Sequence, residues 1–356
     1  MVRPVPHGES KGLISAPEST MLGLMSIPAK ALITGATGFI GSRLAEDLIN
    51  RGWRVSCLLR PESRAGVLVK KPVNILRGPT DDRIRLESAL KGQDYVFHLA
   101  ARIRATTKDL YEKANHLFTR NLAQACLRAN PGLKRFIYVS SVAAAGPSAD
   151  GVIQNETMPC APVSEYGRTK LRGESAVTSI WDRISATIIR PPNVFGPGQP
   201  ETELLVRLIR TRIIPALKDR GKTTCFIYID DLISGMLQAA LNTKAAGKIY
   251  YMTDGHTYSW REVISTIQDC VLGNTLYIAL PEIAINGAAW MADLLKGMKL
   301  MRTRFGRSTW ESMKKRAWLF SSDKAVRELG FKPQYSLERG IRKMLASLDE
   351  DLRSGG

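Results

Sequence analysis

Two ionisable side chains lie four residues apart in the segment Tyr166-Gly167-Arg168-Thr169-Lys170. In a helix this spacing places Tyr166 and Lys170 on one face. A phenol with a pKa of ~10 is a weak acid–base catalyst at neutral pH, but a neighbouring ammonium favours the phenolate and lowers that pKa. The pair therefore predicts a tyrosine that exchanges a proton with a substrate oxygen.

A serine upstream supports this prediction. The run Tyr138-Val139-Ser140-Ser141 ends a strand-like segment, where a serine hydroxyl can hold a substrate oxygen beside the phenol. A Tyr and a Lys at this spacing are also common on solvated surface helices. The pair points to an active site because a serine and a glycine-rich turn precede it in the chain.

The glycine-rich turn reads Thr34-Gly35-Ala36-Thr37-Gly38-Phe39-Ile40-Gly41 and follows a strand-like run. Glycine costs about 0.5–1 kcal/mol inside a regular element, so its repeated use here needs a reason. Gly35 suits the tight turn, Gly38 allows a ligand to approach closely, and Gly41 lets the next helix pack on the strand. Free N–H groups at the helix start then bind a pyrophosphate. The motif predicts a dinucleotide site.

The end of the second strand-like run bears on the choice of cofactor. Arg60 follows this run and Arg64 comes shortly after it. Chains that prefer NAD place a carboxylate about 20 residues after the glycines to bind the ribose 2′-hydroxyl. A planar guanidinium instead suits a 2′-phosphate. We therefore expect NADP(H), with NAD(H) as the alternative if Arg60 is only a solvated surface residue.

The elements that must position these residues alternate between strand and helix. This alternation predicts an α/β protein with a doubly wound parallel sheet, the Rossmann fold. Strand-like runs lie at 31–34, 54–59, 73–76, 94–98, 134–139 and 185–189, and helical stretches near 40–51, 82–91, 107–129 and 164–180. Beyond Arg190 the pattern is less regular and predicts a smaller mixed C-terminal lobe, with helices near 201–211, 230–241, 259–271, 281–296 and 336–347.

Composition sets the wider limits. Residues 1–28 mix polar residues, Pro and Gly without periodicity, and we expect a disordered extension there. A dinucleotide-binding domain is expected over 29–190 and a substrate-binding lobe over 191–350, with some segments returning to the core. The 5 cysteines include no Cys-x-x-Cys pair, and the 4 histidines show no metal-ligand spacing. These patterns favour a reducing, cytoplasmic setting and no metal site.

The net charge of +18 is unusual for a chain of this size. A basic surface favours anionic partners such as phosphorylated cofactors, although it also fits a protein that is merely soluble. We expect no nucleic-acid partner. The segment 283–307 combines an apolar stripe with lysines and arginines, so it fits either a core helix or a peripheral contact with an anionic membrane. The chain has no apolar run of the length that spans a bilayer.

Taken together, the motifs resemble the extended short-chain dehydrogenase/reductase family, also described as NAD-dependent epimerases/dehydratases. The resemblance covers roughly residues 30–345. Besides the glycine-rich turn and Tyr166-x-x-x-Lys170, it rests on His98-Leu99-Ala100-Ala101, Val139-Ser140-Ser141, Arg190-Pro191-Pro192-Asn193-Val194-Phe195-Gly196-Pro197, Phe226-Ile227-Tyr228-Ile229-Asp230-Asp231-Leu232 and Leu329-Gly330-Phe331-Lys332-Pro333.

The resemblance implies roles for single residues. Tyr166 is the general acid/base, Lys170 is its partner, and Ser141 polarises the substrate oxygen with Ser140 in support. Asn115 matches an active-site asparagine of the family, although Phe118 stands where a glycine is usual. The implied cofactor contacts are Gly35, Thr37, Gly38, Phe39, Ile40, Gly41, Leu99, Ala100, Ala101, Tyr166, Lys170, Pro191, Asn193 and Val194. The resemblance also implies a homodimer through the helices near 107–129 and 164–180.

Two departures from the family pattern matter. The family places an Asp after the glycine that follows the third strand, where it contacts adenine. Pro79 stands there in this chain, which leaves Asp81, Asp82 or backbone groups as candidates. Nucleotide-sugar epimerases also carry an Arg where this chain has Thr223-Thr224. The loss of that phosphate contact weakens a sugar-nucleotide reading, whereas Asn193, which such epimerases use, supports it.

Three functions are therefore considered. The first is an NADP(H)-dependent oxidoreductase that interconverts a hydroxyl and a ketone on a bulky apolar substrate such as a steroid-like or β-keto lipid. Dihydroflavonol reductases and 3β-hydroxysteroid dehydrogenases are the similar members. The second is a nucleotide-sugar epimerase or dehydratase with tightly held NAD. The third is a non-catalytic dinucleotide-binding scaffold or sensor, which would not need the Ser141, Tyr166 and Lys170 set.

Overall fold

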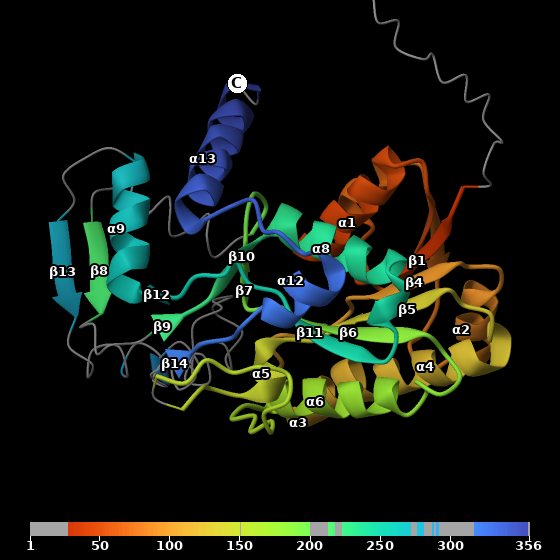
Figure 1. Ribbon diagram of the computed structural model, residues 1–356. Coiled ribbons are helices and arrows are strands. Elements are labelled where there is room, and N and C mark those ends of the chain that lie inside the picture. Colours follow the sequence, from red (N-terminus) through yellow and green to blue (C-terminus); the bar gives the residue numbers. More distant parts are fainter. Residues whose placement is uncertain are drawn as a thin grey trace, which may run out of the picture.

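A computed structural model describes the chain over residues 28–149, 151–199, 213–217, 223–271, 276–280, 287, 290–291 and 317–354 (Figure 1). Residues 1–27 of the expected extension over 1–28, and the helix near 201–211, lie outside these residues. So does nearly all of the 283–307 segment. Among the residues that the structure describes, every helix is too short or too polar to span a membrane.

A seven-stranded parallel sheet forms the centre of the molecule. Its order reverses between β1 and β4, which in an open α/β sheet marks the place where ligands bind. In sheet order the strands are β11 (Lys248–Tyr251), β6 (Ala186–Arg190), β5 (Arg135–Val139), β4 (Tyr95–His98), β1 (Lys30–Thr34), β2 (Arg54–Leu59) and β3 (Val73–Arg77).

Both faces of the sheet are buried because apolar residues fill consecutive strand positions. On β1, Ala31 and Ile33 face one hydrophobic core and Leu32 faces the other. On β5, Ile137 and Val139 belong to the first core, whereas Phe136 and Tyr138 belong to the second. This alternation follows from the two-residue period of a strand and requires helices on both sides of the sheet.

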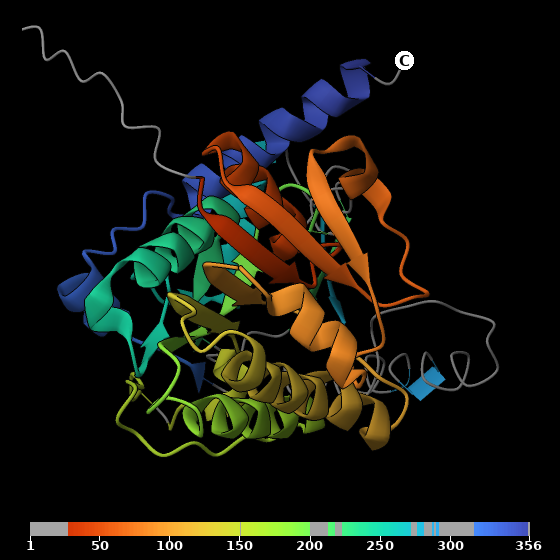
Figure 2. The same cartoon turned by 90° about the vertical axis from the view of Figure 1, so that its right-hand side faces the viewer.

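The helices supply that cover. One face carries α1 (Phe39–Asn50) and α8 (Ile229–Leu241), and the other carries α2 (Arg83–Leu90), α4 (Phe118–Ala129) and α6 (Glu165–Thr178) (Figure 1). Figure 2 shows the same layers from the side, with α4 and α6 below the sheet and the dark-blue α13 above it. The sheet is therefore doubly wound, as the sequence predicts.

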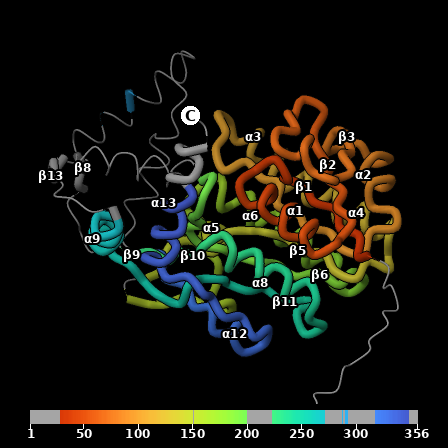
Figure 3. Tube along the Cα trace, turned by 90° about the horizontal axis from the view of Figure 1, so that it is seen from above, coloured from red at the N-terminus to blue at the C-terminus, as the bar shows by residue number. Residues whose placement is uncertain are grey.

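The remaining elements form smaller sheets and the helices beside them. In Figure 3, α9 lies on the opposite side of the molecule from β3. The short strands pair as β7 (Asn193–Phe195) with β10 (Phe226–Tyr228), β9 (Thr223–Thr224) with β12 (Tyr258–Ser259) and β14 (Ala317–Trp318), and β8 (Ile213–Leu217) with β13 (Leu276–Leu280). The other helices are α3 (Lys108–Tyr111), α5 (Val142–Ala145), α9 (Trp260–Val271), α12 (Asp323–Leu329) and α13 (Leu337–Ser354).

Most of the predicted elements are confirmed, and three details differ. The sheet gains its seventh strand, β11, from the C-terminal part of the chain. The helix expected over 107–129 is divided, because a π-helical turn over Glu112–Leu117 separates α3 from α4. Helix α12 was not predicted. It ends at Gly330, whose φ of 71° is the left-handed conformation that glycine adopts readily.

Candidate active site

The candidate residues gather at one edge of the sheet because all the strands run in the same direction. The last residue of β1, Thr34, is in register with His98 at the end of β4. His98 is in turn in register with Tyr138, and Val139 with Ile189 on β6. The turns that follow these strands therefore meet at the carboxyl edge. They contain the glycine-rich turn, Leu99–Ala101, Ser140–Ser141 and Pro191–Val194.

The glycine-rich turn has the geometry of a dinucleotide cradle. Gly35 has a φ of 76°, and a Cβ there would lie 2.7 Å from the N atom of Ala100. A Cβ on Gly41 would lie 2.2 Å from the carbonyl oxygen of Gly35, so glycine allows α1 to pack on the turn. Gly38 caps α1, whose first turn carries no acidic residue. The helix start can therefore accept an anion, and these residues fit a pyrophosphate.

Ser141 and Tyr166 are brought together by α5 and α6. Ser141 caps α5, with its Oγ accepting a hydrogen bond of 3.1 Å from the N–H of Ala143. Gly167, next to the tyrosine, lets α6 approach α5, since a Cβ there would lie 2.1 Å from the carbonyl oxygen of Ala143. The Ser141 hydroxyl then lies close enough to the Tyr166 phenol to lower the pKa of the phenol. A substrate oxygen at this pair would meet two hydroxyl groups.

The acidity of Tyr166 differs from the expectation from sequence. Burial raises the pKa of Tyr166 to about 12, and the nearby Ser141 hydroxyl only partly offsets this increase. The sequence predicts that Lys170 lowers the pKa of Tyr166, and this lowering is not found. The Lys170 ammonium is itself buried and donates its hydrogen bond to the carbonyl oxygen of Val139. The phenol is therefore protonated at neutral pH.

Lys170 is almost fully buried, with 1% of its surface exposed. Its Nζ donates a 2.7 Å hydrogen bond to the carbonyl oxygen of Val139 and lies 4.2 Å from the centre of the Tyr138 ring. Burial lowers the pKa of Lys170 to about 7, although the negative charge of Glu174 opposes this decrease. Lys170 thus changes charge close to neutral pH.

A buried ion pair lies one helical turn beyond Lys170. Glu174 on α6 and Arg190 at the end of β6 are each 3% exposed and are 2.6 Å apart. The Glu174 carboxylate also accepts a 2.5 Å hydrogen bond from the Ser140 hydroxyl, and Arg190 donates to the Tyr251 hydroxyl at 2.9 Å. This network ties α6 to the ends of β5, β6 and β11. It therefore fixes the helix that carries Tyr166 and Lys170.

Asn115 lies in the π-helical turn and holds the loop after β4. Its Oδ1 accepts a 2.7 Å hydrogen bond from the N–H of Arg102, and its Nδ2 donates to the carbonyl oxygen of Arg102 at 3.0 Å. Nδ2 also donates to the Thr169 hydroxyl at 3.0 Å. Thr169 is adjacent to Lys170, so Asn115 connects this loop to α6.

His98 gives the end of β4 a second polar link. Its Nδ1 lies 2.6 Å from the Thr34 hydroxyl and its Nε2 lies 2.9 Å from the Thr119 hydroxyl. Burial lowers the pKa of His98 to about 3, and the positive charge of Lys170 adds to this shift. The ring is therefore neutral and fixes Thr34, whose hydroxyl accepts a 3.3 Å hydrogen bond from the N–H of Ala100.

The other predicted cofactor contacts occupy the same edge of the sheet. Arg60 and Arg64 are exposed in the turn after β2, and Arg60 pairs with Glu62 at 3.0 Å. The Asp82 carboxylate caps α2 by accepting a 3.0 Å hydrogen bond from the N–H of Arg85, while Asp81 is exposed. Exposure varies in the rest of the set: Thr37, Gly38, Ala101 and Asn193 are exposed, Phe39, Ile40, Leu99, Ala100 and Val194 are half-buried, and Pro191 is buried.

Sequence reasoning missed the residues that support the site from behind. Gly167, Thr169 and Glu174 lie between or just after the recognised Tyr166 and Lys170. They contact distant parts of the chain: Gly167 packs against α5, Thr169 bonds to Asn115, and Glu174 pairs with Arg190. A signal was nevertheless present, because Glu174 follows Lys170 at helical spacing and Arg190 ends a strand. A buried charge is costly unless an opposite charge lies beside it, so Glu174 and Arg190 could have been expected to pair. Within the described part of the chain, no cluster of residues could hold a metal ion.

The chain also matches known proteins. Residues 31–252 match the model of the NAD dependent epimerase/dehydratase family. A ceramide reductase from Caulobacter vibrioides is 30% identical over 278 residues, which cover 77% of this chain and 80% of that protein. A 2-alkyl-3-oxoalkanoate reductase from Stenotrophomonas maltophilia is 30% identical, over 89% of this chain and 99% of that protein.

A solved structure shares the fold over nearly the whole chain. MoeE5, in complex with UDP-glucose and NAD, has a TM-score of 0.71 and 25% sequence identity, and the match covers 91% of this chain and all of that one. The glycine cradle, the doubly wound sheet and the ordered motifs agree with these matches. The chain belongs to the NAD-dependent epimerase/dehydratase family and is an NAD(P)-dependent oxidoreductase of the extended short-chain dehydrogenase/reductase type.

Proposed function

We propose that this protein uses NADP(H) to interconvert a ketone and a hydroxyl group on a bulky apolar substrate, such as a steroid-like or β-keto lipid. The observation that carries this proposal is the close packing of α6 on α5, which brings the Ser141 hydroxyl beside the Tyr166 phenol at the carboxyl edge of the sheet. Two neighbouring hydroxyl groups suit a single substrate oxygen. A scaffold or sensor would need neither of them.

Ser141 and Tyr166 have different roles at the substrate oxygen. When bound, the nicotinamide supplies or accepts a hydride at the substrate carbon. Ser141 holds the substrate oxygen, and Tyr166 donates its phenolic proton to this oxygen during reduction or removes the proton during oxidation. Since burial raises the pKa of Tyr166 to about 12, the phenol is a proton donor at neutral pH.

Lys170 and Asn115 position the elements around the proposed site. The Lys170 ammonium lies at the end of β5 through its bond to Val139, where it would hold the nicotinamide ribose and respond to the charge of the site. Asn115 fixes the loop after β4. Gly35, Gly38 and Gly41 would receive the pyrophosphate. The chemistry then requires no metal ion, because the proton and the hydrogen-bond donors are supplied by side chains.

Two arguments favour an apolar substrate over a sugar nucleotide. The relatives named above include reductases that are named for ceramide and for 2-alkyl-3-oxoalkanoate. At the position where sugar-nucleotide epimerases carry an arginine, this chain has Thr223 and Thr224, which form β9, and Thr224 is 4% exposed. A buried threonine does not provide the charge-assisted contact that a diphosphate needs.

A nucleotide-sugar epimerase with tightly held NAD is the second candidate. It is favoured by the match to MoeE5, which was solved with UDP-glucose and NAD, and by the presence of Asn193. The Asn193 amide donates to the Thr224 hydroxyl at 2.9 Å. This contact engages one side of the amide and leaves its oxygen for a ligand.

The two candidates differ in an experiment that uses the purified full chain. We expect NADPH consumption with a panel of hydrophobic ketones and β-keto acyl thioesters, and no nicotinamide released when the protein is denatured. Turnover of UDP-glucose or GDP-mannose by protein that retains NAD would contradict the proposal and support the epimerase.

The choice of cofactor is tested by a separate variant. Arg60→Asp should shift the preference from NADPH towards NADH, because a carboxylate repels the 2′-phosphate. An unchanged preference would remove the cofactor argument.

A further inference from the structure

The turn after β2 is held by an arginine from the next strand. Arg77 ends β3 and is in register with Leu59, the last residue of β2. Its Nη1 atom lies within hydrogen-bond distance of three backbone carbonyl oxygens: Arg60 at 3.3 Å, Pro61 at 3.1 Å and Ser63 at 2.9 Å. A single guanidinium thus contacts three of the carbonyl groups of this turn.

This turn carries the residues that face the cofactor's ribose in the proposed function. Apart from the arginine clamp, one backbone hydrogen bond closes it, from the N–H of Ser63 to the carbonyl oxygen of Arg60 at 3.0 Å. The Arg60 side chain is 48% exposed and pairs with Glu62, which is 64% exposed. An exposed pair of this kind contributes little stability and leaves the guanidinium able to exchange Glu62 for a phosphate.

Carbonyl oxygens that converge on one point repel one another unless a cation lies between them. Hydrogen bonds from a charged donor are about twice as strong as neutral ones, so Arg77 stabilises this particular shape of the turn. A turn that already has its bound shape loses less conformational freedom when a ligand binds. The contribution of Arg77 would therefore be greatest for a ligand that Arg60 must contact.

We propose that Arg77 is a positioning residue for cofactor choice, which holds the turn 60–63 so that Arg60 meets the 2′-phosphate of NADP(H). The inference rests on the proposed preference for NADP(H). We assign Arg77 an indirect role, because its Nη1 atom is engaged by the carbonyl groups of the turn. Its effect must therefore pass through Arg60 and must be selective for the phosphorylated cofactor.

A double-mutant cycle on the full-length protein tests this dependence. Dissociation constants of NADPH and NADH are measured for the wild type, Arg77→Met, Arg60→Ala and the double variant. We expect Arg77→Met to weaken NADPH binding about tenfold, the scale of one charge-assisted contact, and to change NADH binding less than about twofold. We expect the double variant to bind NADPH no more weakly than Arg60→Ala, because coupled residues are not additive.

A matched control removes the same charge from the next helix. Arg83 on α2 is 69% exposed and pairs with Glu87, so Arg83→Met should leave both dissociation constants unchanged. Unchanged NADH binding also shows that each variant is folded. If the wild type prefers NADPH but Arg77→Met keeps that preference, or if the two substitutions add, the inference alone is overturned. Equal affinity of the wild type for both cofactors contradicts the proposed NADP(H) preference itself.

Discussion

At the scale of single residues, the candidate site contains two groups, Lys170 and Tyr166, whose charged forms are disfavoured by burial. Lys170 is buried, so its pKa falls to about 7, and the pKa of Tyr166 rises to about 12. The negative charge of Glu174 offsets part of the free-energy cost of burying the lysine, and Glu174 itself forms an ion pair with Arg190. Perturbed groups that lie together at a sheet edge are typical of active sites. They also cost stability, which a purely structural network would avoid.

The role of Tyr166 is tested by removing one oxygen atom. Tyr166→Phe should lower kcat by about 10²–10⁴-fold, the usual contribution of a general acid or base, because Ser141 alone cannot supply a proton at the right point. Cofactor affinity should change little. Tyr335→Phe is the control, since that hydroxyl accepts a hydrogen bond from Lys343 on α13. Wild-type turnover in the Tyr166 variant would rule out the assigned role.

The burial of Lys170 predicts a pH effect on stability. Between pH ~7 and pH ~10, the unfolded chain binds a proton at this lysine that the folded chain does not, so its contribution to stability increases with pH in this range. Lys170→Met removes the titrating group. The variant should therefore be more stable than the wild type at pH 7, by a margin that shrinks as the pH approaches 9.5.

Thermal unfolding followed by circular dichroism at several pH values measures this margin. Lys91→Met, at the exposed end of α2, serves as the control, and its curve should run parallel to that of the wild type. A Lys170→Met curve that is also parallel would mean that the lysine stays charged in the folded protein. Activity should be lost in Lys170→Met at every pH.

At the scale of elements, the site depends on how closely backbones approach one another. Gly41 allows α1 to pack on the glycine-rich turn, and Gly167 allows α6 to pack on α5. Gly173 extends this contact, since a Cβ there would lie 2.3 Å from the hydroxyl of Tyr138. Small residues on two helices therefore decide how near the phenol and the cradle come to the ends of the strands.

Adding one methyl group tests the approach of α1. A Cβ at position 41 would meet the backbone of Gly35 at 2.2 Å, and backbone cannot yield as a side-chain tip does. We expect Gly41→Ala to lower the free energy of unfolding by about 1–3 kcal/mol and to weaken NADPH and NADH binding equally. A Cβ at Gly132 would have no atom within 4 Å, so Gly132→Ala should change neither the free energy of unfolding nor cofactor binding. Unaltered cofactor binding in Gly41→Ala would show that the turn is not a tight cradle.

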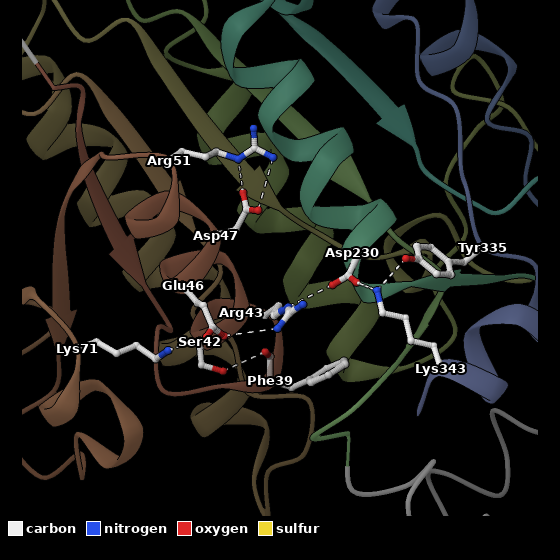
Figure 4. A network of polar contacts seen from close by, with 10 residues as sticks. All are labelled: Phe39, Ser42, Arg43, Glu46, Asp47, Arg51, Lys71, Asp230, Tyr335 and Lys343. Atoms are coloured by element: carbon white, nitrogen blue, oxygen red, sulfur yellow. Dashed lines mark hydrogen bonds and ion pairs between the residues drawn. The ribbon is translucent and has the colours of Figure 1, made fainter. Parts of the chain in front are cut away.

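At the scale of the whole molecule, a polar network joins three helices that are far apart in the sequence. The Asp230 carboxylate on α8 pairs with Arg43 on α1 at 3.1 Å and with Lys343 on α13 at 2.8 Å (Figure 4). Lys343 also donates to the Tyr335 hydroxyl at 2.7 Å. Asp230 follows the buried strand β10, so this network attaches the C-terminal helix to the helix that begins at the glycine cradle.

The strength of this attachment is measurable by salt. These side chains are partly exposed, and such pairs contribute about 0.2–1 kcal/mol each. We expect Asp230→Asn to lower Tm by about 1–3 °C at low ionic strength, and the difference should disappear at ~1 M NaCl because salt screens exposed charges. Glu338→Gln removes a pair that lies within α13 and should have a smaller effect. A deficit that persists at high salt would indicate packing rather than charge.

Much of the site could be predicted from the sequence because its main signals are local. The Tyr166-x-x-x-Lys170 spacing fixes a shared helix face, the glycine-rich turn follows a strand by chain order, and parallel strands bring their carboxyl ends together whatever their distance along the chain. For the same reason six strands of the central sheet were predicted within one residue. The family motifs lie on these elements, so the fold and enzyme class followed from them.

The tertiary structure alone decided the properties that depend on distant neighbours. The direction of the Tyr166 pKa shift, the pairing of Glu174 with Arg190, and the hold of Asn115 on the loop after β4 all arise between elements that are separate in sequence. The same holds for the grip of Arg77 on the turn after β2. Burial and opposite charge are supplied by packing, and a linear pattern does not record which surfaces meet.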